Sequence, residues 1–529
     1  MISRRHLLQL LQSVAVATAG SALPLPNDPG PVELPQDNAT ETLCKQSATT
    51  LLSHMRAKKL SPVELIDASI DRIERLNPLV NAFVRTRFEY ARQQAKIAEA
   101  RYMHGTARPL EGLPLATKDA FEFVAGVPST HGCRVLKRLN YTLPFTSGQL
   151  QRLFGAGAIH IGVTNAPEFA FKGVTDNYAY GVTRTPFDLT KNAGGSSGGA
   201  AAAVAASLTP LATGGDAGGS VRIPAAFCGV VGFKPTFGRI PEAEGPLAFL
   251  SHTPFLHPGP LTRTVDDAAL MMQFMAAPDT RNPFSLPDRL DFRQLPSVAG
   301  KRIAYSPDLG SYPIAQTVRT VLDRAVQDLV HSGLSVEPVT PQLPDQREMS
   351  DLWNLQMAVL NASSVMDFFA WNDHIDLDAY KDELDPAFLA TLTPADGLSA
   401  RAFRNADFLQ RARILSGIED VLATHDFLIT PTVGIVSIPN RDDGSTTGPT
   451  SVNGVAVDPG IGWALTHPIN QTGHPAISIP AGFTEHGFPI GMQIIGRRWQ
   501  DREVLALARL FEQIRPWEGR YPATGVKKP

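Results

Sequence analysis

The sequence is poor in cysteine. Only Cys44, Cys133 and Cys228 occur among 529 residues, which is too few for a fold held together by many disulfides. Their odd number leaves at least one thiol unpaired, and no CxxC or paired Cys/His spacing indicates a zinc site. The cysteine content therefore excludes a disulfide-rich scaffold and gives no sign of a structural metal.

The sequence also lacks an excess of either charge. It has 48 Lys and Arg against 51 Asp and Glu, which gives a formal net charge of -3. A basic excess is what displaces counterions from nucleic-acid phosphates, so we expect no nucleic-acid partner. No apolar run reaches the roughly 20 residues of a membrane-spanning helix. We therefore expect no stable membrane insertion once the N-terminal segment is removed.

That N-terminal segment has the pattern of an export signal. A Ser-Arg-Arg triplet at residues 3–5 precedes a short apolar run over residues 7–19, and small residues follow. These features are typical of a signal peptide, and the arginine pair resembles the twin-arginine type, although Leu7 and Gln9 depart from it. The alternative is an amphipathic helix without a targeting role. We predict a signal peptide over residues 1–22, a Pro-rich linker over 23–44 and export to the periplasm.

Apolar strand-like runs alternate with helical stretches along the rest of the chain. Ser61 to Glu64 form a capping box with Pro at the first helical position, and this helix is predicted to stop before Pro78. Alternation of this kind predicts an α/β fold with a largely parallel or mixed sheet. The strand candidates are residues 113–116, 158–163, 230–233, 303–305, 427–429, 476–479 and 490–495.

Two glycine clusters stand out, GGSSGG at residues 194–199 and GGDAGGS at residues 214–220. Amide-rich turns of this kind can hold a developing negative charge. The Ala/Val run between them argues against a flexible linker, and no Lys follows to make a phosphate-binding loop. Gly194-x-Ser196-x-Gly198 matches a nucleophile elbow only weakly, because the preceding segment is polar and turn-like. The histidines downstream that could complete such a triad are His425, His467, His474 and His486, and nothing singles one out.

Residues 194–235 resemble the signature segment of the amidase signature family. The match covers both clusters, the GGSxRxPA pattern that contains Arg222 and the G-x-K-P end at Lys234. Segments 112–119, 164–169, 180–183, 470–476 and 489–493 also fit, so the resemblance spans about residues 45–515. It implies one large domain over residues 45–529, with a mixed central β-sheet flanked by helices on both faces. The departures from the family pattern are Cys133, Thr185, Ala193 and His474.

The resemblance also implies a catalytic triad. Ser220 is expected to be the acylated nucleophile, and Ser196, on a cis Gly195–Ser196 bond, the serine that relays protons to Lys118. Lys118 follows an apolar strand, so burial should lower its pKa and leave a neutral amine that can act as a base. The alternative for Lys118 is a structural salt bridge with Asp119.

Further residues receive supporting roles from the same resemblance. The backbone amides of Ala217, Gly218, Gly219 and Ser220 are expected to form the oxyanion hole. Ser197 is expected to orient Lys118, and we interpret Asp216 and Arg222 as a structural ion pair that holds the loop. Asn470 and Gln493 are expected to be polar groups behind the site.

The expected activity is cleavage of a carboxylic acid amide, through an acyl-enzyme on Ser220, to a carboxylate and ammonia or an amine. No metal or organic cofactor is expected. An esterase or aryl acylamidase-type activity is an alternative, and so is the amidase subunit of a glutamine-dependent tRNA amidotransferase. A non-catalytic protein on this fold would be expected to lose one of the three catalytic residues. The aromatic and Met-containing stretch 352–369 indicates either an apolar acyl pocket or core.

Overall fold

The computed structural model describes residues 39–242, 248–249, 252, 255–367, 369–370, 374–522 and 526. The expected signal peptide over residues 1–22 lies outside these residues. All of them belong to one compact unit that begins at Asp37. Residues 39–44 were expected to be linker, but they form helix α2 (Ala39–Cys44), which packs on α4 (Pro62–Val80). Glu41 explains this attachment, because its carboxylate pairs with Arg75 at 2.9 Å.

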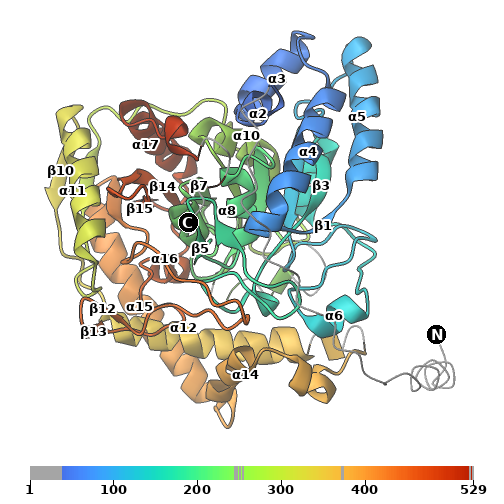
Figure 1. Cartoon of the computed structure of the whole chain (residues 1–529). Coiled ribbons are helices and arrows are strands. Elements are labelled where there is room, and N and C mark those ends of the chain that lie inside the picture. Colours follow the sequence, from blue (N-terminus) through green and yellow to red (C-terminus); the bar gives the residue numbers. More distant parts are fainter. Residues whose placement is uncertain are drawn as a thin grey trace. The chain divides into compact units, whose positions relative to one another are not determined.

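A mixed sheet of 11 strands forms the centre of the unit (Figure 1). The strands β3, β2 and β6 pair in parallel, as do β11, β9 and β10, and the remaining neighbours are antiparallel. The predicted α/β fold with a mixed sheet is therefore confirmed. In spatial order the strands are β1 (Phe83–Thr86), β3 (Ile159–Thr164), β2 (Pro114–Lys118), β6 (Leu211–Asp216), β8 (His257–Thr262), β7 (Val231–Lys234), β14 (Ala476–Phe483), β15 (Pro489–Gly496), β11 (Phe427–Pro431), β9 (Arg302–Tyr305) and β10 (Ser335–Pro338).

Helices cover both faces of this sheet, because successive strand residues point to opposite sides. On β2, Leu115 belongs to one buried cluster and Ala116 to another. On β11, Phe427 and Leu428 divide in the same way. The first face carries α3 (Ala48–Arg56), α7 (Gly148–Gly155), α10 (Val265–Met275), α11 (Gln316–His331) and α17 (Asp501–Ile514). The second carries α4, α5 (Phe88–Met103), α8 (Gly198–Ala205), α9 (Arg222–Cys228), α12 (Gln346–Asn361), α15 (Ala400–Thr424) and α16 (His467–Thr472).

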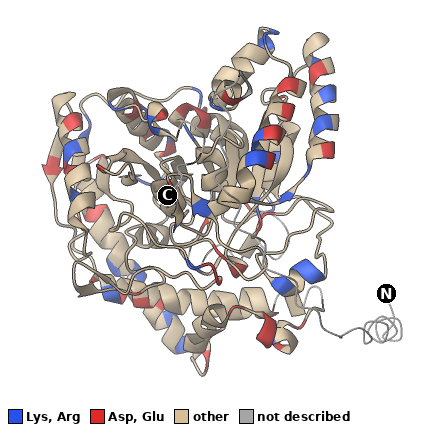
Figure 2. Ribbon diagram, in the orientation of Figure 1, with Lys and Arg blue, Asp and Glu red and all other residues tan. Residues whose placement is uncertain are grey.

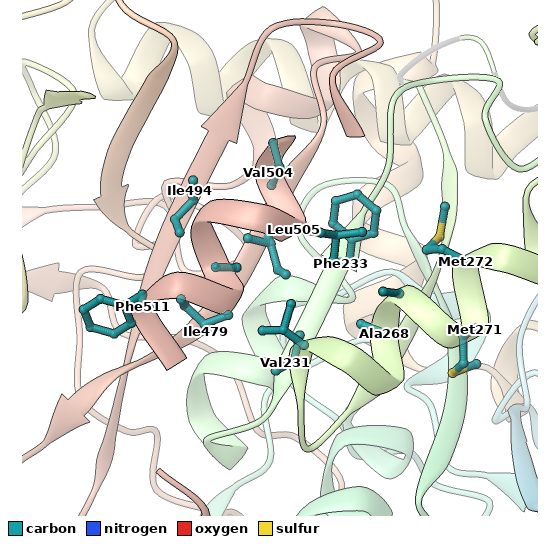
Figure 3. Packing of buried hydrophobic residues seen from close by; sticks show 14 of the residues in the cluster. Val231, Phe233, Ala268, Met271, Met272, Ile479, Ile494, Val504, Leu505 and Phe511 are labelled. Carbon is teal, nitrogen blue, oxygen red and sulfur yellow. The ribbon is translucent and has the colours of Figure 1, made fainter. Parts of the chain in front are cut away.

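The core on the first face is dense and apolar. Figure 3 shows Leu505 of α17 and Ala268 of α10 lying over Val231, Phe233 and strand residues from β14 and β15. All of these side chains are buried. Burial of apolar area on this scale is the main favourable term in the stability of the unit.

The second glycine cluster continues from β6, and the first leads into α8. Because β2 and β6 are parallel, their last residues, Lys118 and Asp216, lie at the same edge of the sheet. β8 runs antiparallel to β6, so its first residue, His257, pairs with Asp216 at that edge. The topology thus brings three polar side chains together from positions far apart in the sequence.

One predicted boundary was wrong. Helix α4 begins with the predicted capping box, in which Ser61 accepts from Val63 N and Glu64 accepts from Ser61 N. It runs through Pro78 to Val80 and ends at Asn81, which has φ 51°. Pro78 lies in the last turn, where it removes only one hydrogen bond of the helix. Among the described residues, no helix is both long and apolar enough to cross a membrane.

We predict that Gly199→Ala destabilises the protein by about 3 kcal/mol, because a methyl group there would overpack α8 against two neighbouring backbone segments. A Cβ at Gly199 would lie 2.6 Å from Asn165 O and 2.7 Å from Ala82 O, and neither backbone atom can turn away. The matched control is Gly155→Ala at the end of α7, where a Cβ meets nothing within 4 Å. Denaturant unfolding should give a change within about 0.5 kcal/mol for this control. Equal stability of the two variants would contradict the prediction.

Candidate active site

Lys118 ends strand β2 with its side chain inside the protein. It is 2% exposed, and its Nζ donates to Ser196 Oγ at 2.7 Å and approaches Gly215 O at 3.5 Å. Burial lowers the pKa of Lys118 to about 8, while the negative charges of Glu122 and Asp216 oppose the shift. A fraction of this amine is therefore neutral near pH 7, as the sequence predicts.

The alternative role of Lys118 as a salt-bridge partner of Asp119 does not fit the geometry. The Asp119 carboxylate accepts instead from Thr130 N at 2.7 Å, from Thr130 Oγ1 at 2.5 Å and from Gly132 N at 3.1 Å. Asp119 therefore stabilises the loop after β2, whereas the amine of Lys118 donates to Ser196.

Ser196 sits in the first glycine cluster, immediately before α8. The Gly195–Ser196 peptide bond is cis, as the family resemblance implies. Glycine is required at position 195, since a Cβ there would lie 2.6 Å from the backbone of Val174. Ser197 Oγ is oriented toward Gly215 O at 3.4 Å, the same carbonyl that Lys118 Nζ approaches. Ser197 therefore lies beside Lys118, and a shared acceptor joins the two side chains.

Lys118, Ser196 and Ser220 line one cavity of about 930 Å³, including its solvent-open mouth. Ser220 is partly exposed there, whereas the other two are buried. Among the described residues, no hydrogen bond joins Ser196 Oγ to Ser220 Oγ; such contacts are often long before substrate binds. Much of the remaining wall is apolar and includes Phe121, Phe123, Phe169, Leu256, Met357, Leu360 and Val365.

The stretch 352–369 contributes to both the cavity and the core. Met357, Leu360 and Val365 line the cavity, whereas Leu352 packs in a buried cluster with α15. Each of the two interpretations left open by the sequence is therefore correct for part of the segment. Cavity residues and core residues of this segment differ only in the direction of their side chains. Apolar spacing alone does not give that direction.

The loop after β6 presents backbone amides beside Ser220. Gly219 N is occupied, because it donates to Asp216 Oδ1 at 2.8 Å. Gly219 was expected to contribute its amide to the oxyanion hole, and the structure corrects this. Its φ of +129° allows the turn, and its N–H points to the Asp216 carboxylate. Within the part of the chain that the structure describes, the amides of Ala217, Gly218 and Ser220 have no hydrogen-bond acceptor. These three amides are the donors left for a ligand oxygen.

A buried ion pair holds this loop in place. Asp216 accepts from Arg222 Nη2 at 2.8 Å and from Arg222 Nε at 3.0 Å, and both side chains are fully buried. Arg222 also donates to Asn470 Oδ1 and Gln493 Oε1, each at 2.6 Å. Although burial alone would raise it, the pKa of Asp216 is held well below its usual range by the Arg222 charge. The structural role expected for the pair agrees with these contacts.

None of the four candidate histidines lines the cavity with Ser220. His467, for example, is buried against Tyr312, with Nε2 2.9 Å from the Tyr312 hydroxyl. Sequence reasoning missed three titratable groups that do line it, His257, Glu122 and Glu242. Glu122 lies four residues after Lys118, and no motif distinguishes it. Burial keeps the pKa of His257 well below its usual value. No group of three or more His, Cys, Asp or Glu in the described ranges could hold a metal ion.

We predict that Arg222→Met lowers the free energy of unfolding by about 3–5 kcal/mol at neutral pH, because it leaves a buried carboxylate unpaired. The loss should shrink as the pH falls, since a protonated Asp216 no longer needs the cation. Denaturant unfolding at neutral and acidic pH measures both effects. The matched control is Arg92→Met, which breaks a 2.8 Å pair of half-exposed side chains and should cost about 0.2–1 kcal/mol. A loss at Arg222 as small as this would contradict the prediction.

Comparisons with known proteins agree with this architecture. The family model described as Amidase matches residues 64–505. An acylamidase of Rhodococcus erythropolis is 35% identical over 488 residues, covering 91% of this chain and 98% of the relative. A glutamyl-tRNA(Gln) amidotransferase subunit of Symbiobacterium thermophilum is 33% identical over 504 residues, covering 90% and 98%.

Solved structures show the same likeness. A bacterial aryl acylamidase of the amidase signature family superposes with a TM-score of 0.86 at 36% identity, over 91% of this chain and 99% of that one. A 6-aminohexanoate cyclic dimer hydrolase superposes with a TM-score of 0.80 at 29% identity, over 91% and 99%. With a family model that matches most of its length and relatives above 30% identity, this chain belongs to the amidase signature family.

Proposed function

We propose that this protein hydrolyses carboxylic acid amides through an acyl-enzyme formed on Ser220. The observation that carries the proposal is the 2.7 Å hydrogen bond from the buried Lys118 amine to Ser196 Oγ, in the cavity that Ser220 also lines. A serine hydroxyl needs a base before it can act as a nucleophile. In this cavity the buried amine is the base that the geometry offers, and Ser196 is the group between it and Ser220.

The proposed reaction begins when neutral Lys118 accepts the Ser196 proton as Ser196 accepts that of Ser220. Ser220 Oγ attacks the amide carbonyl, and the oxyanion binds to the amides of Ala217, Gly218 and Ser220. The C–N bond then breaks, and the leaving amine takes the proton back through Ser196. Water hydrolyses the acyl-enzyme by the same relay, which gives the carboxylate and restores Ser220. Loss of one oxyanion donor costs about 10²–10³ in rate in other enzymes.

The substrates that fit this cavity best are amides with an apolar acyl or aryl group. Three phenylalanines, Phe121, Phe123 and Phe169, line it together with aliphatic side chains, so the substrate gains affinity by burying apolar area. The acylamidase and aryl acylamidase relatives favour the same class. Esters would form the same acyl-enzyme, so an esterase activity remains the adjacent alternative.

The role of an amidotransferase subunit is the weaker alternative. The relative of that name shares a similar identity with this chain, but the expected export signal argues against a cytoplasmic complex. Both α4 and α5 also carry acidic residues among their basic ones (Figure 2). Turnover of aliphatic, aryl and peptide amides and the matching esters by the purified mature chain separates these activities.

We predict that Ser220→Ala abolishes covalent labelling by a fluorophosphonate, because the nucleophile is absent, while the protein stays folded. Lys118→Ala should lose amide hydrolysis at neutral pH, since no base remains to activate Ser220. Mass spectrometry and a turnover assay measure the two effects. The control is Ser53→Ala on the exposed side of α3, which should label like the natural chain. Full labelling of Ser220→Ala would disprove the assignment of the nucleophile.

We further propose that residues 1–22 direct export by the twin-arginine route to the periplasm. The Arg4-Arg5 pair before a short apolar run supports this. In a tagged chain, replacing both arginines by lysine should keep the protein in the cytoplasm, as cell fractionation would show. A single exposed change such as Arg92→Lys should not alter its location. Periplasmic accumulation of the double variant would contradict the proposed route.

A further inference from the structure

Glu122 is a buried carboxyl group in the catalytic cavity to which the proposed mechanism gives no role. It lies in the turn after β2 and is 6% exposed. Its Oε2 accepts from the backbone N of Lys118 at 2.8 Å and from Thr213 Oγ1 at 2.6 Å. Because Thr213 belongs to β6, the carboxyl group is fixed between the two parallel strands that end at Lys118 and Asp216.

The other oxygen of Glu122 has a different environment. Oε1 is buried and has no hydrogen-bond donor among the described residues. Ionising a carboxyl group there is costly, because one oxygen has lost its water without gaining a partner. Burial accordingly raises the pKa of Glu122 to about 7, and the Lys118 charge opposes the rise. Glu122 thus shares a water-poor environment with the amine whose backbone N–H it binds.

Three other titratable groups near Lys118 do not change charge near neutral pH. Asp216 is paired with Arg222, which holds its pKa well below the usual range. Burial lowers the pKa of His131, from the loop after β2, to about 3. His257 at the start of β8 likewise has a pKa well below its usual value. Both imidazoles are therefore neutral where Lys118 titrates.

Two further carboxyl groups lie close to this region. Asp119 has a pKa raised to about 6 by burial, but its carboxylate binds Thr130 and Gly132 and does not contribute to the Lys118 shift. Glu242 also lies on the cavity wall. Glu122 is thus a carboxyl group that accepts from the backbone N of Lys118 and has a pKa near neutral pH.

We propose that Glu122 is a positioning residue that sets the proton affinity of the Lys118 amine and, with it, the lower pH limit of turnover. The inference rests on the proposed role of Lys118 as the base. Burial alone would make Lys118 a weak base, and a weak base takes the serine proton poorly. The ionised Glu122 carboxylate counteracts burial by stabilising the ammonium form. The pair therefore titrates as one coupled unit, and its protonation state fixes how much neutral amine is present.

Glu122→Gln tests this proposal. The amide keeps the shape and an oxygen that can accept from Lys118 N and Thr213 Oγ1, but it removes the charge. The acid limb of the pH profile should move to lower pH by about one unit, because Lys118 loses its proton more easily. Fluorophosphonate labelling of Ser220 measures this without substrate binding, and kcat/KM should follow. A folded variant whose acid limb does not move overturns the proposal.

Two more variants secure the result. Asp119→Asn makes the same carboxyl-to-amide change beside Lys118 at a group with different partners, and its acid limb should stay in place. An equal shift there would overturn a specific role for Glu122. If Glu122→Gln fails to fold, Thr213→Val replaces it. This variant removes one donor from the carboxylate, which raises the pKa of Glu122 and should shift the limb in the same direction. An unmoved limb in folded Thr213→Val then overturns the proposal.

The proposed function can fail separately. If Lys118→Ala keeps its activity at neutral pH, Lys118 is not the base and both proposals fall. If Lys118→Ala is inactive while Glu122→Gln keeps the natural acid limb, the base assignment stands and only the role of Glu122 is lost.

Discussion

The burial of the Lys118 amine against Ser196 is the constraint on which the site depends. An ammonium in this position would have lost most of its water, so the surroundings favour the neutral amine. The hydrogen bond to Ser196 and the approach to the Gly215 carbonyl provide directed partners for the amine. A single strand end therefore combines two properties that a general base needs, a lowered pKa and a fixed direction.

The parallel pairing of β2 with β6 extends this constraint to the rest of the site. It places Asp216 at the same sheet edge as Lys118, and the Asp216–Arg222 pair then fixes the loop that carries Ser220. Through Asn470 and Gln493, Arg222 also joins this loop to α16 and β15. The backbone amides of the loop are thus preorganised by an ion-pair network that lies behind them and leaves the cavity side open. Preorganisation of this kind is what makes amide donors effective in a transition state.

Much of the fold followed from local pattern. The capping box at Ser61, the seven predicted strands and the α/β alternation lie where local pattern indicated them, whereas β1, β6, β8 and β10 were not predicted. The errors fall where local rules compete with packing. Helix α4 continues through Pro78 because the missing hydrogen bond lies in its final turn. Helix α2 forms in the expected linker, where Glu41 pairs with Arg75 of α4. Neither the place of Pro78 in the last turn nor the pairing of Glu41 with Arg75 can be read from the neighbouring sequence.

The site divides in the same way. The sequence motifs alone identified the two glycine clusters and the family. They also identified Lys118, Ser196 and Ser220 as the candidate catalytic residues. Only the tertiary structure decided that the Gly219 amide faces Asp216 and that Glu122 lies against Lys118. The physical reason is direction. Chain spacing fixes which residue types are available, but where each N–H or carboxylate points depends on the strand pairing and close packing of segments far apart in the chain.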